Sequence, residues 1–449
     1  MEREKLEDLF HDLDPALGVL SGGDPRQIRL VRGGSEAGSR VIERYAAVPR
    51  LTDPRALLPL DATNLAWPAI LGQYAAGAAS PLARAAARVL GVANMVGATS
   101  VFLRDRVSVV TDRDSLVDTP LHEFLSDVLG RKDFVISLRL APRRPNGKPV
   151  AQVVAHDGEI LAYAKFGWET LTRQLVRREA AVLDELGPLT RGTLLQVPRA
   201  LYKGQWRGIE ALVVAPLAGM GRTPNSLADL PIAASVALAD LSPRTDERLG
   251  SSGFWRRTGS QAAQVGPLLS EHARQIVKQT CDLIESRWGD VKLQMGRSHG
   301  DWIPPNISIR DDKGFNVWDW ERSESRVPLG IDAMQFILFL ELRRRILGRR
   351  LGRRALAHGR DALDRLGLPA KDQTLLMMLS LLRSLLWFGE ARQAGRGEDE
   401  DNRFAEGLEQ FLDWNRKSAA VPAARRKLDV SKSANRSPDR LGTETRITT

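Results

Sequence analysis

The sequence predicts an α+β fold, and three patterns in the chain indicate it. Short β-type runs, each bounded by turn-forming residues, occupy 134–140, 150–154, 160–166 and 209–214. Between the third and fourth runs, apolar residues recur at helical spacing from Thr170 to Leu186. Further on, 307–309 and 315–318 alternate like strands around Asp311-Asp312-Lys313-Gly314, which predicts a β-hairpin.

The composition is that of a globular protein with more than one domain. The chain has 449 residues, of which 43% are hydrophobic and 27% charged, and this length exceeds the usual size of a single core. The most apolar regions, 65–103 and 375–388, are interrupted by arginines before they reach the length that a bilayer requires. The first residues lack the apolar core of a signal peptide, and the single cysteine, Cys281, excludes an intramolecular disulfide. We therefore expect a cytoplasmic protein without a transmembrane segment.

The two ends of the chain differ from its middle. Residues 1–125 predict an appended α/β domain of unknown role, with an Ala-rich helix at Pro81–Leu90 and β-like runs at 27–31, 40–48 and 107–111. Residues 418–449 are rich in Ser, Arg, Lys and Pro and predict a disordered basic tail.

One stretch carries the strongest functional signal. It reads Ser298-His299-Gly300-Asp301-Trp302-Ile303-Pro304-Pro305-Asn306 and is followed, after the hairpin, by Asp319-Trp320-Glu321. Phosphoryl transfer needs an aligned acceptor hydroxyl and metal ions on the phosphates rather than covalent help from the protein. Asp301 would accept the hydroxyl proton, while the amide oxygen of Asn306 and the carboxylate of Asp319 would hold Mg²⁺.

Other chemistries lack their motifs. The chain has no Gly-x-x-x-x-Gly-Lys-Ser/Thr loop, no His-Glu-x-x-His pair and no Cys-x-x-Cys pair. In the alternative interpretation, these residues have only structural roles. Asp301 and Asn306 then cap the loop, and Asp319 is part of a turn.

The His-Gly-Asp-x-x-x-x-Asn pattern, followed by a hydrophobic strand and Asp-Trp-Glu, resembles the aminoglycoside phosphotransferase and choline kinase superfamily of small-molecule kinases. The resemblance covers roughly 126–418. It implies a two-lobed protein-kinase-like fold, with an antiparallel sheet in an N-lobe at 126–218 and a mainly helical C-lobe at 219–417. It also implies ATP as the phosphoryl donor, with GTP as the alternative, together with Mg²⁺. In such a site His299 is structural.

Four further residues take their roles from this resemblance. Lys165 ends the strand at 160–166 and Glu179 lies on the following helix, similar to the lysine and glutamate that hold the nucleotide phosphates in kinases. Ala215 and Leu217, just after the strand at 209–214, would offer a carbonyl and an amide to adenine. The loop at 141–148 would cover the phosphates, but with one glycine it is equally an ordinary basic hairpin.

The expected activity is ATP- and Mg²⁺-dependent phosphorylation of a hydroxyl on a small molecule, sugar-like or another neutral or anionic metabolite. A protein substrate is disfavoured, because the chain from Asp319 to Pro328 leaves no room for an activation segment. Two alternatives remain, a catalytically silent kinase-like binding module and a true aminoglycoside kinase. The net charge of +10 disfavours a polycationic acceptor. We expect no nucleic-acid partner.

Two features bear on the partners of the C-lobe. The Arg-rich run Glu341–Arg360 predicts a single helix, which either has a solvated charged face or contacts phosphorylated substrates or anionic lipid surfaces. The candidates for the acceptor pocket are Trp255, Arg256, Arg257 and Trp302.

Overall fold

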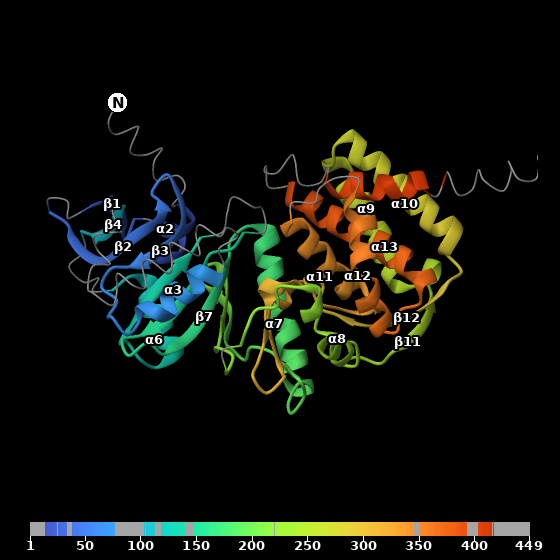
Figure 1. The fold of residues 1–449 in the computed structure, drawn as a ribbon. Coiled ribbons are helices and arrows are strands. Elements are labelled where there is room, and N and C mark those ends of the chain that lie inside the picture. Colours follow the sequence, from blue (N-terminus) through green and yellow to red (C-terminus); the bar gives the residue numbers. More distant parts are fainter. Residues whose placement is uncertain are drawn as a thin grey trace, which may run out of the picture.

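An antiparallel sheet and a group of helices form the two halves of the molecule, with helix α7 (Thr170–Leu189) between them (Figure 1). The structure is a computed structural model. It describes residues 14–24, 26–33, 38–76, 103, 105–112, 118–140, 147–219, 221–344, 350–392, 403–414 and 416. The predicted two-lobed α+β architecture is confirmed.

One nine-stranded sheet runs through the N-lobe and the N-terminal region in the order β1-β4-β2-β3-β5-β6-β7-β10-β9. Its strands are β1 (Arg29–Arg32), β2 (Arg40–Arg50), β3 (Asp53–Pro59), β4 (Arg106–Thr111), β5 (Phe134–Arg139), β6 (Val150–Ala155), β7 (Ile160–Gly167), β9 (Ala200–Trp206) and β10 (Ile209–Val214). The predicted strands are confirmed with small shifts at their ends, whereas β3 and β9 are additional.

The N-terminal strands are continuous with the N-lobe. Strand β3 pairs antiparallel with β5, with Ala56 opposite Arg139 and Leu57 opposite Leu138. The predicted boundary at residue 125 is not tested by this pairing and stays a prediction, although helix α6 (Pro120–Leu129) crosses it.

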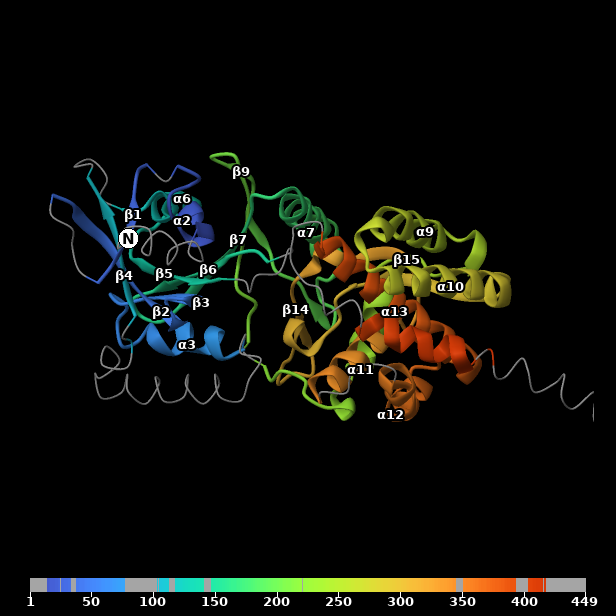
Figure 2. The same ribbon diagram turned by 90° about the horizontal axis from the view of Figure 1, so that it is seen from above.

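Helices cover both faces of the sheet (Figure 2). They are α2 (Asp14–Leu20) and α6 on one face and α3 (Trp67–Ala76) on the other. Leu20 and Leu125 share a core with Val153, while Ile70 shares a second core with Val154. Adjacent residues of β6 thus belong to different cores, because successive side chains of a strand point to opposite faces.

The C-lobe is mainly helical, as predicted. Its helices are α8 (Ile232–Ala239), α9 (Gly253–Val265), α10 (Glu271–Trp288), α11 (Ile331–Arg343), α12 (Leu351–Arg365), α13 (Ala370–Arg392) and a last helix at 403–414. Two small sheets accompany them, β11 (Thr245–Arg248), β12 (Lys292–Ser298) and β15 (Glu324–Pro328) in one and β13 (Ile307–Ile309), β14 (Phe315–Val317) and β8 (Leu195–Gln196) in the other. The predicted hairpin is the β13–β14 pair.

Helix α7 connects the two lobes through its buried face. Val176, Leu183 and Leu186 recur at helical spacing and pack into the core of the C-lobe. Glu179 lies on the same face and is only 2% exposed. A buried carboxylate needs partners, and the site described below supplies them.

One prediction in the C-lobe is wrong. The Arg-rich run was expected to form one helix, but α11 ends at Arg343 and α12 begins at Leu351. The charge run is thus divided between two helices. The predicted Ala-rich helix at Pro81–Leu90, most of the loop at 141–148 and the tail at 418–449 lie outside the described residues. Among the helices of the described ranges, none has the length and apolar character needed to cross a bilayer.

Candidate active site

The loop that carries Asp301 follows strand β12 and turns at a glycine. Gly300 has a φ of +85°, and a Cβ at this position would lie 2.1 Å from the carbonyl oxygen of Arg322. Any side chain would therefore collide with backbone, and only glycine fits. The Gly of the His-Gly-Asp motif is explained by this close approach.

A carboxylate at the start of α11 holds the same loop in place. Asp332 accepts hydrogen bonds from the Ser298 hydroxyl at 2.7 Å, from the His299 amide at 2.9 Å and from the Gly300 amide at 3.1 Å. Gln335, one turn later, donates to the Gly300 carbonyl at 2.8 Å. These are positioning residues, and they are not predictable from the motif because they lie beyond it. The one sign of this role in the sequence is that Asp332 is an acidic residue in the first turn of the helix after the motif.

His299 is fully buried and links the two halves of the site. Its Nδ1 accepts a hydrogen bond from the Asp301 amide at 3.2 Å, so its Nε2 carries the proton that is donated to the Trp318 carbonyl at 3.0 Å. Burial lowers the pKa of His299, although Asp332 and Asp319 oppose this shift. The imidazole is thus neutral and has both nitrogens in use, which agrees with the predicted structural role.

Asp301 lies beside Asn306 at the end of this loop. The Asn306 amide donates to the Asp301 carboxylate at 2.9 Å and to the Asp301 carbonyl at 3.0 Å. Burial and the nearby charge of Asp319 raise the pKa of Asp301 to about 7, although the hydrogen bond from Asn306 lowers it. A carboxylate with a pKa near neutrality is suited to accept a proton during a reaction.

The β13–β14 hairpin brings Asp319 back toward Asn306. The Trp318 amide donates to the Asn306 carbonyl at 3.2 Å, which holds the two ends of the hairpin together. Asp319 then adopts a left-handed backbone with a φ of +72°. Aspartate tolerates this conformation better than most residues, and such backbones are found most often at functional sites.

Lys165, on strand β7 of the nine-stranded sheet, reaches the same place. Its Nζ lies 2.7 Å from both carboxylate oxygens of Glu179 and 2.5 Å from Oδ1 of Asp319. Burial alone would lower the pKa of Lys165, but the charges of Asp319, Glu179 and Glu321 outweigh burial and raise it. For Asp319, the charges of Lys165 and Lys148 outweigh burial and hold its pKa well below the usual value. Lys165 is thus a cation and Asp319 an anion at neutral pH.

Three carboxylates gather around Lys165. One oxygen from each of Glu179, Asp319 and Glu321 lies within 4.8 Å of the others. A second lysine, Lys148, pairs with Glu321. Two lysines and three carboxylates leave one negative charge in surplus, and hard oxygen donors are the ligands that Mg²⁺ prefers. The donor set of Asp319 and its neighbours therefore fits Mg²⁺. Asn306 can add only its amide oxygen, because its nitrogen is committed to Asp301.

The linker after β10 is fixed to the same hairpin. The side-chain amide of Asn316, on β14, donates to the carbonyls of Ala218 at 3.2 Å and Gly219 at 2.9 Å. Ala215 and Leu217 are half-buried on this linker, and the Ala215 amide is bonded to the Arg199 carbonyl at 2.8 Å. Their roles toward adenine stay a prediction.

Five of the predicted site residues fall into two contacting groups, whereas Ala215 and Leu217 lie on the linker after β10. Lys165, Glu179 and Asp319 form one group, and Asp301 and Asn306 form the other. The backbone bond between Trp318 and Asn306 joins them. Two charged residues next to the first group, Lys148 and Glu321, have no individual role in the predictions from the sequence, although Lys148 ends the predicted phosphate-covering loop and Glu321 belongs to the Asp-Trp-Glu motif.

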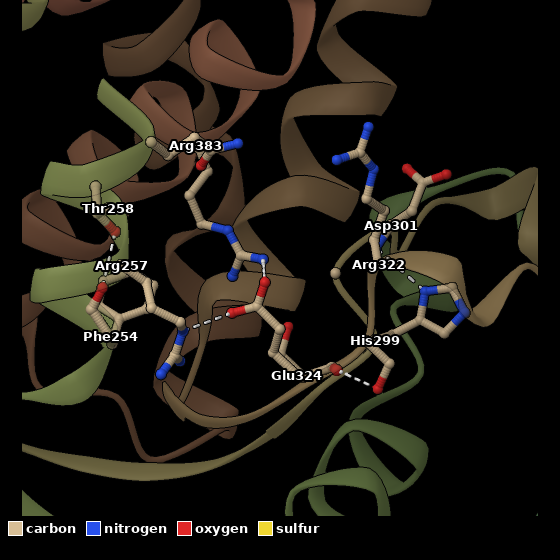
Figure 3. Close-up of polar contacts among 12 residues, drawn as sticks. Phe254, Arg257, Thr258, His299, Asp301, Arg322, Glu324 and Arg383 are labelled. Carbon is tan, nitrogen blue, oxygen red and sulfur yellow. Dashed lines mark hydrogen bonds and ion pairs between the residues drawn. The ribbon is translucent and has the colours of Figure 1, made fainter. Parts of the chain in front are cut away.

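A cavity of about 250 Å³ lies next to the Asp301 loop, between α7, α9, α13 and β15. Arg257 is among its lining residues, whereas Trp302 is fully buried in the core of the C-lobe. Figure 3 shows Asp301 and Arg322 side by side, with Glu324, Arg257 and Arg383 beyond them. Arg322 therefore borders both the loop and the cavity.

Several solved structures have a similar fold. The choline kinase LicA from Streptococcus pneumoniae is 14% identical, with a TM-score of 0.42, and the match covers 64% of this chain and 97% of that one. A thermostable mutant of the aminoglycoside phosphotransferase APH(4)-Ia, in a ternary complex with ADP and hygromycin B, is 14% identical with a TM-score of 0.44, and the match covers 66% and 98%. No protein-family model and no curated protein matches the chain.

Both structures come from the superfamily that the His299 motif resembles. At this identity and these TM-scores, the likeness carries no conclusion about activity. The functional proposal rests instead on the contacts among Lys165, Glu179, Asp301, Asn306 and Asp319.

Proposed function

We propose that this protein is a phosphotransferase that moves the γ-phosphoryl group of ATP to a hydroxyl of a small molecule. The observation that carries the proposal is the contact of Lys165 with both Glu179 and Asp319, three residues from three separate elements. If Asp319 were only a turn residue, its contact with a buried lysine from the sheet would serve no purpose. Kinase sites combine such a lysine and glutamate with a metal-binding aspartate and a catalytic carboxylate.

Asp301 is the proposed base. The acceptor hydroxyl gives its proton to the Asp301 carboxylate while its oxygen forms a bond to the γ-phosphorus, and the bond from phosphorus to the bridging oxygen of ADP breaks. Asn306 orients the carboxylate through its hydrogen bond at 2.9 Å. The pKa of about 7 leaves a large fraction of Asp301 ionised and able to accept a proton at neutral pH.

Lys165 and the metal-binding oxygens provide for the nucleotide. Lys165 would bind the phosphates as a cation, with Glu179 fixing its position. Asp319 and Asn306 would hold Mg²⁺, which when bound neutralises charge on the phosphates. Ala215 and Leu217 would bind adenine through their backbone groups. GTP is the alternative donor. Only the linker contacts involve the base of the nucleotide, so the proposed contacts to the phosphates are the same for ATP and GTP.

The acceptor is proposed to be a small molecule in the cytoplasm. Directly after Asp319, the chain forms the short helix at Trp320–Arg322 and then strand β15, so no segment is left there to hold a peptide. A single cysteine is compatible with a reducing compartment. The following test distinguishes this activity from the alternative, a catalytically silent kinase-like binding module.

The test replaces Asp301 by asparagine. An acceptor is first found by incubating the purified protein with labelled ATP and a metabolite extract. Asp301→Asn then lowers kcat by about a hundredfold or more, because general base catalysis contributes on this order, while ATP still binds. Asp311→Asn, an exposed change in the turn of the neighbouring hairpin, leaves kcat unaltered. Near-normal turnover in the Asp301 variant refutes its assignment as base, and ATP binding without transfer to any acceptor favours the silent module.

A further inference from the structure

The cavity beside the Asp301 loop has an unusual concentration of guanidinium groups. Four arginines line it, together with two glutamates, Glu324 and Glu390. The arginines are Arg178, Arg257, Arg322 and Arg383. Arg322 is paired with Glu390 at 2.9 Å, which leaves three arginines to share Glu324.

One carboxylate cannot neutralise three guanidinium groups. Glu324 lies 3.1 Å from Arg178, 3.4 Å from Arg257 and 3.9 Å from Arg383. Among the residues that line the cavity, three positive charges against one negative charge leave a surplus of two, of which the nearby Asp332 offsets part at Arg383. Figure 3 shows Arg257 and Arg383 converging on Glu324, and all three residues line the cavity. A surplus of this size in a partly enclosed space attracts anions.

Arg383 is the least satisfied member of this group. Its side chain is only 5% exposed. Within the described part of the chain, neither of its terminal nitrogens has a hydrogen-bond partner, since Glu324 at 3.9 Å is too far away. The guanidinium lies 4.9 Å from the centre of the Trp387 ring and 5.8 Å from that of Phe254. Ring contacts offset only part of the cost of burying an unpaired charge.

The position of the cavity connects it with the reaction. The Arg322 backbone packs against Gly300, the residue before Asp301, and the Arg322 side chain lines the cavity. A molecule held by the arginines therefore lies next to the proposed base. Burial also lowers the pKa of Arg383, which a bound anion would counteract.

We propose that the acceptor carries an oxyanion group, a carboxylate or a phosphate, which binds to Arg383 together with Arg257 and Arg178. This inference rests on the proposed phosphotransferase function and names its class of substrate. Guanidinium groups form paired hydrogen bonds with planar or tetrahedral oxyanions. A neutral acceptor would leave Arg383 unpaired, and a polycation such as an aminoglycoside would be repelled.

The test measures anion binding without requiring the true acceptor. The midpoint of thermal unfolding is followed at constant ionic strength while NaCl is replaced by sodium phosphate, as the phosphate probe, or by sodium glycolate, as the carboxylate probe. Ethylene glycol is the uncharged probe and kanamycin the cationic one. Saturating ADP is present throughout, so that the probes do not report binding at Lys165.

Three variants locate the effect. Arg383→Met removes the buried charge and keeps a side chain of similar length. Arg257→Met removes a charge at a half-exposed position, where the change does not put folding at risk. Arg274→Met, at an exposed position on α10 outside the cavity, is the control for loss of one positive charge. Phosphate or glycolate stabilises the wild type and the control, whereas in both cavity variants the half-saturating concentration rises by about tenfold or more, as expected for loss of a charged hydrogen-bond donor.

The outcomes separate the two proposals. A response to phosphate but not to glycolate assigns a phosphate group, and the reverse assigns a carboxylate. Equal stabilisation of the wild type and both cavity variants, or stabilisation by kanamycin in place of the anions, overturns the inference. ATP binding, measured by calorimetry on the same proteins without ADP, tests the phosphotransferase proposal independently. ATP binding without an anion response leaves that proposal standing and removes this one.

Discussion

At the scale of single residues, Asp301 shows how a carboxylate is adjusted for proton transfer. Partial burial and the neighbouring Asp319 disfavour its charged form, and its pKa rises to about 7. Asn306 opposes this shift by donating a hydrogen bond to the ionised group. The result is a base that is poised near neutral pH, at a cost in stability that the fold must offset.

This cost has a definite pH dependence. Asp301 has a higher pKa in the folded protein than its ordinary value of 3.8. The folded state therefore binds its proton more tightly than the unfolded state, and the associated stability is fully present below pH 3.8 and is lost as the pH rises toward 7. Asparagine carries no charge at any pH. Asp301→Asn should thus be as stable as the wild type near pH 4 and more stable at pH 8.

Chemical denaturation of both proteins at several pH values measures this difference. Comparing the two proteins cancels the titration of all other groups to first order. A stability difference that does not change between pH 4 and pH 8 would show that Asp301 ionises freely in the fold.

The residues of the site were predictable to different degrees. Asp301, Asn306 and Asp319 could be proposed from the sequence because the chemistry of phosphoryl transfer dictates their side-chain types and spacing. Asp332 and Arg383 could not be identified. Asp332 binds backbone amides from a distance in the sequence, and any acidic residue at a helix start looks the same. Arg383 lies in an apolar helix, where the sequence does not reveal what it faces.

At the scale of elements, the Asp301 loop depends on its attachment to α11. Asp332 accepts three hydrogen bonds from the loop, and it is buried with only 8% of its surface exposed. Asparagine at this position has one acceptor oxygen in place of two. Asp332→Asn should destabilise the protein by about 1–3 kcal/mol, the usual cost of leaving buried polar groups unsatisfied.

The same change should reduce kcat more than it weakens ATP binding, because the displaced loop carries the base. Asp372→Asn is the matched control, since Asp372 also lies in the first turn of a helix but is only half-buried. Denaturation, calorimetry and turnover of the two variants decide the role of Asp332. If Asp332→Asn is destabilised with unchanged kcat, its role is purely structural.

Short-range elements were predicted well and longer ones less well. The β13–β14 hairpin follows from the local turn signal at Asp311–Gly314, which acts within a few residues. The Arg-rich run was predicted as one helix because its leucines and arginines keep helical spacing throughout. The break between α11 and α12 depends instead on packing against α13, as Leu351 and Ala355 enter the common core. Such tertiary requirements override local propensity.

At the scale of the whole molecule, the N-terminal strands and the N-lobe form one sheet. Leu57 of β3 and Leu138 of β5 are opposite each other and both fully buried. Val19 and Leu20 of α2 cover the same face. Removing residues 1–117 would therefore expose the edge of β5 and part of a hydrophobic core, which promotes aggregation.

A chain that begins at residue 118 should accordingly be insoluble or show a clearly lowered unfolding temperature. Expression of this fragment beside the full chain, followed by size-exclusion chromatography and circular dichroism, makes the comparison. A monomeric, fully folded fragment would instead support the boundary near residue 125 that the sequence predicts.

Mg²⁺-dependent nucleotide binding at Asp319 is the central requirement of the proposed site. Calorimetric titration of ATP into the wild type, with and without Mg²⁺, should show much tighter binding with the metal. Asp319→Ala should lose this strengthening, because it removes a carboxylate that the proposal gives to the metal, while Asp311→Ala in the nearby turn should keep it. An unchanged metal effect in Asp319→Ala would mean that Asp319 is only a turn residue, and would contradict the proposed site.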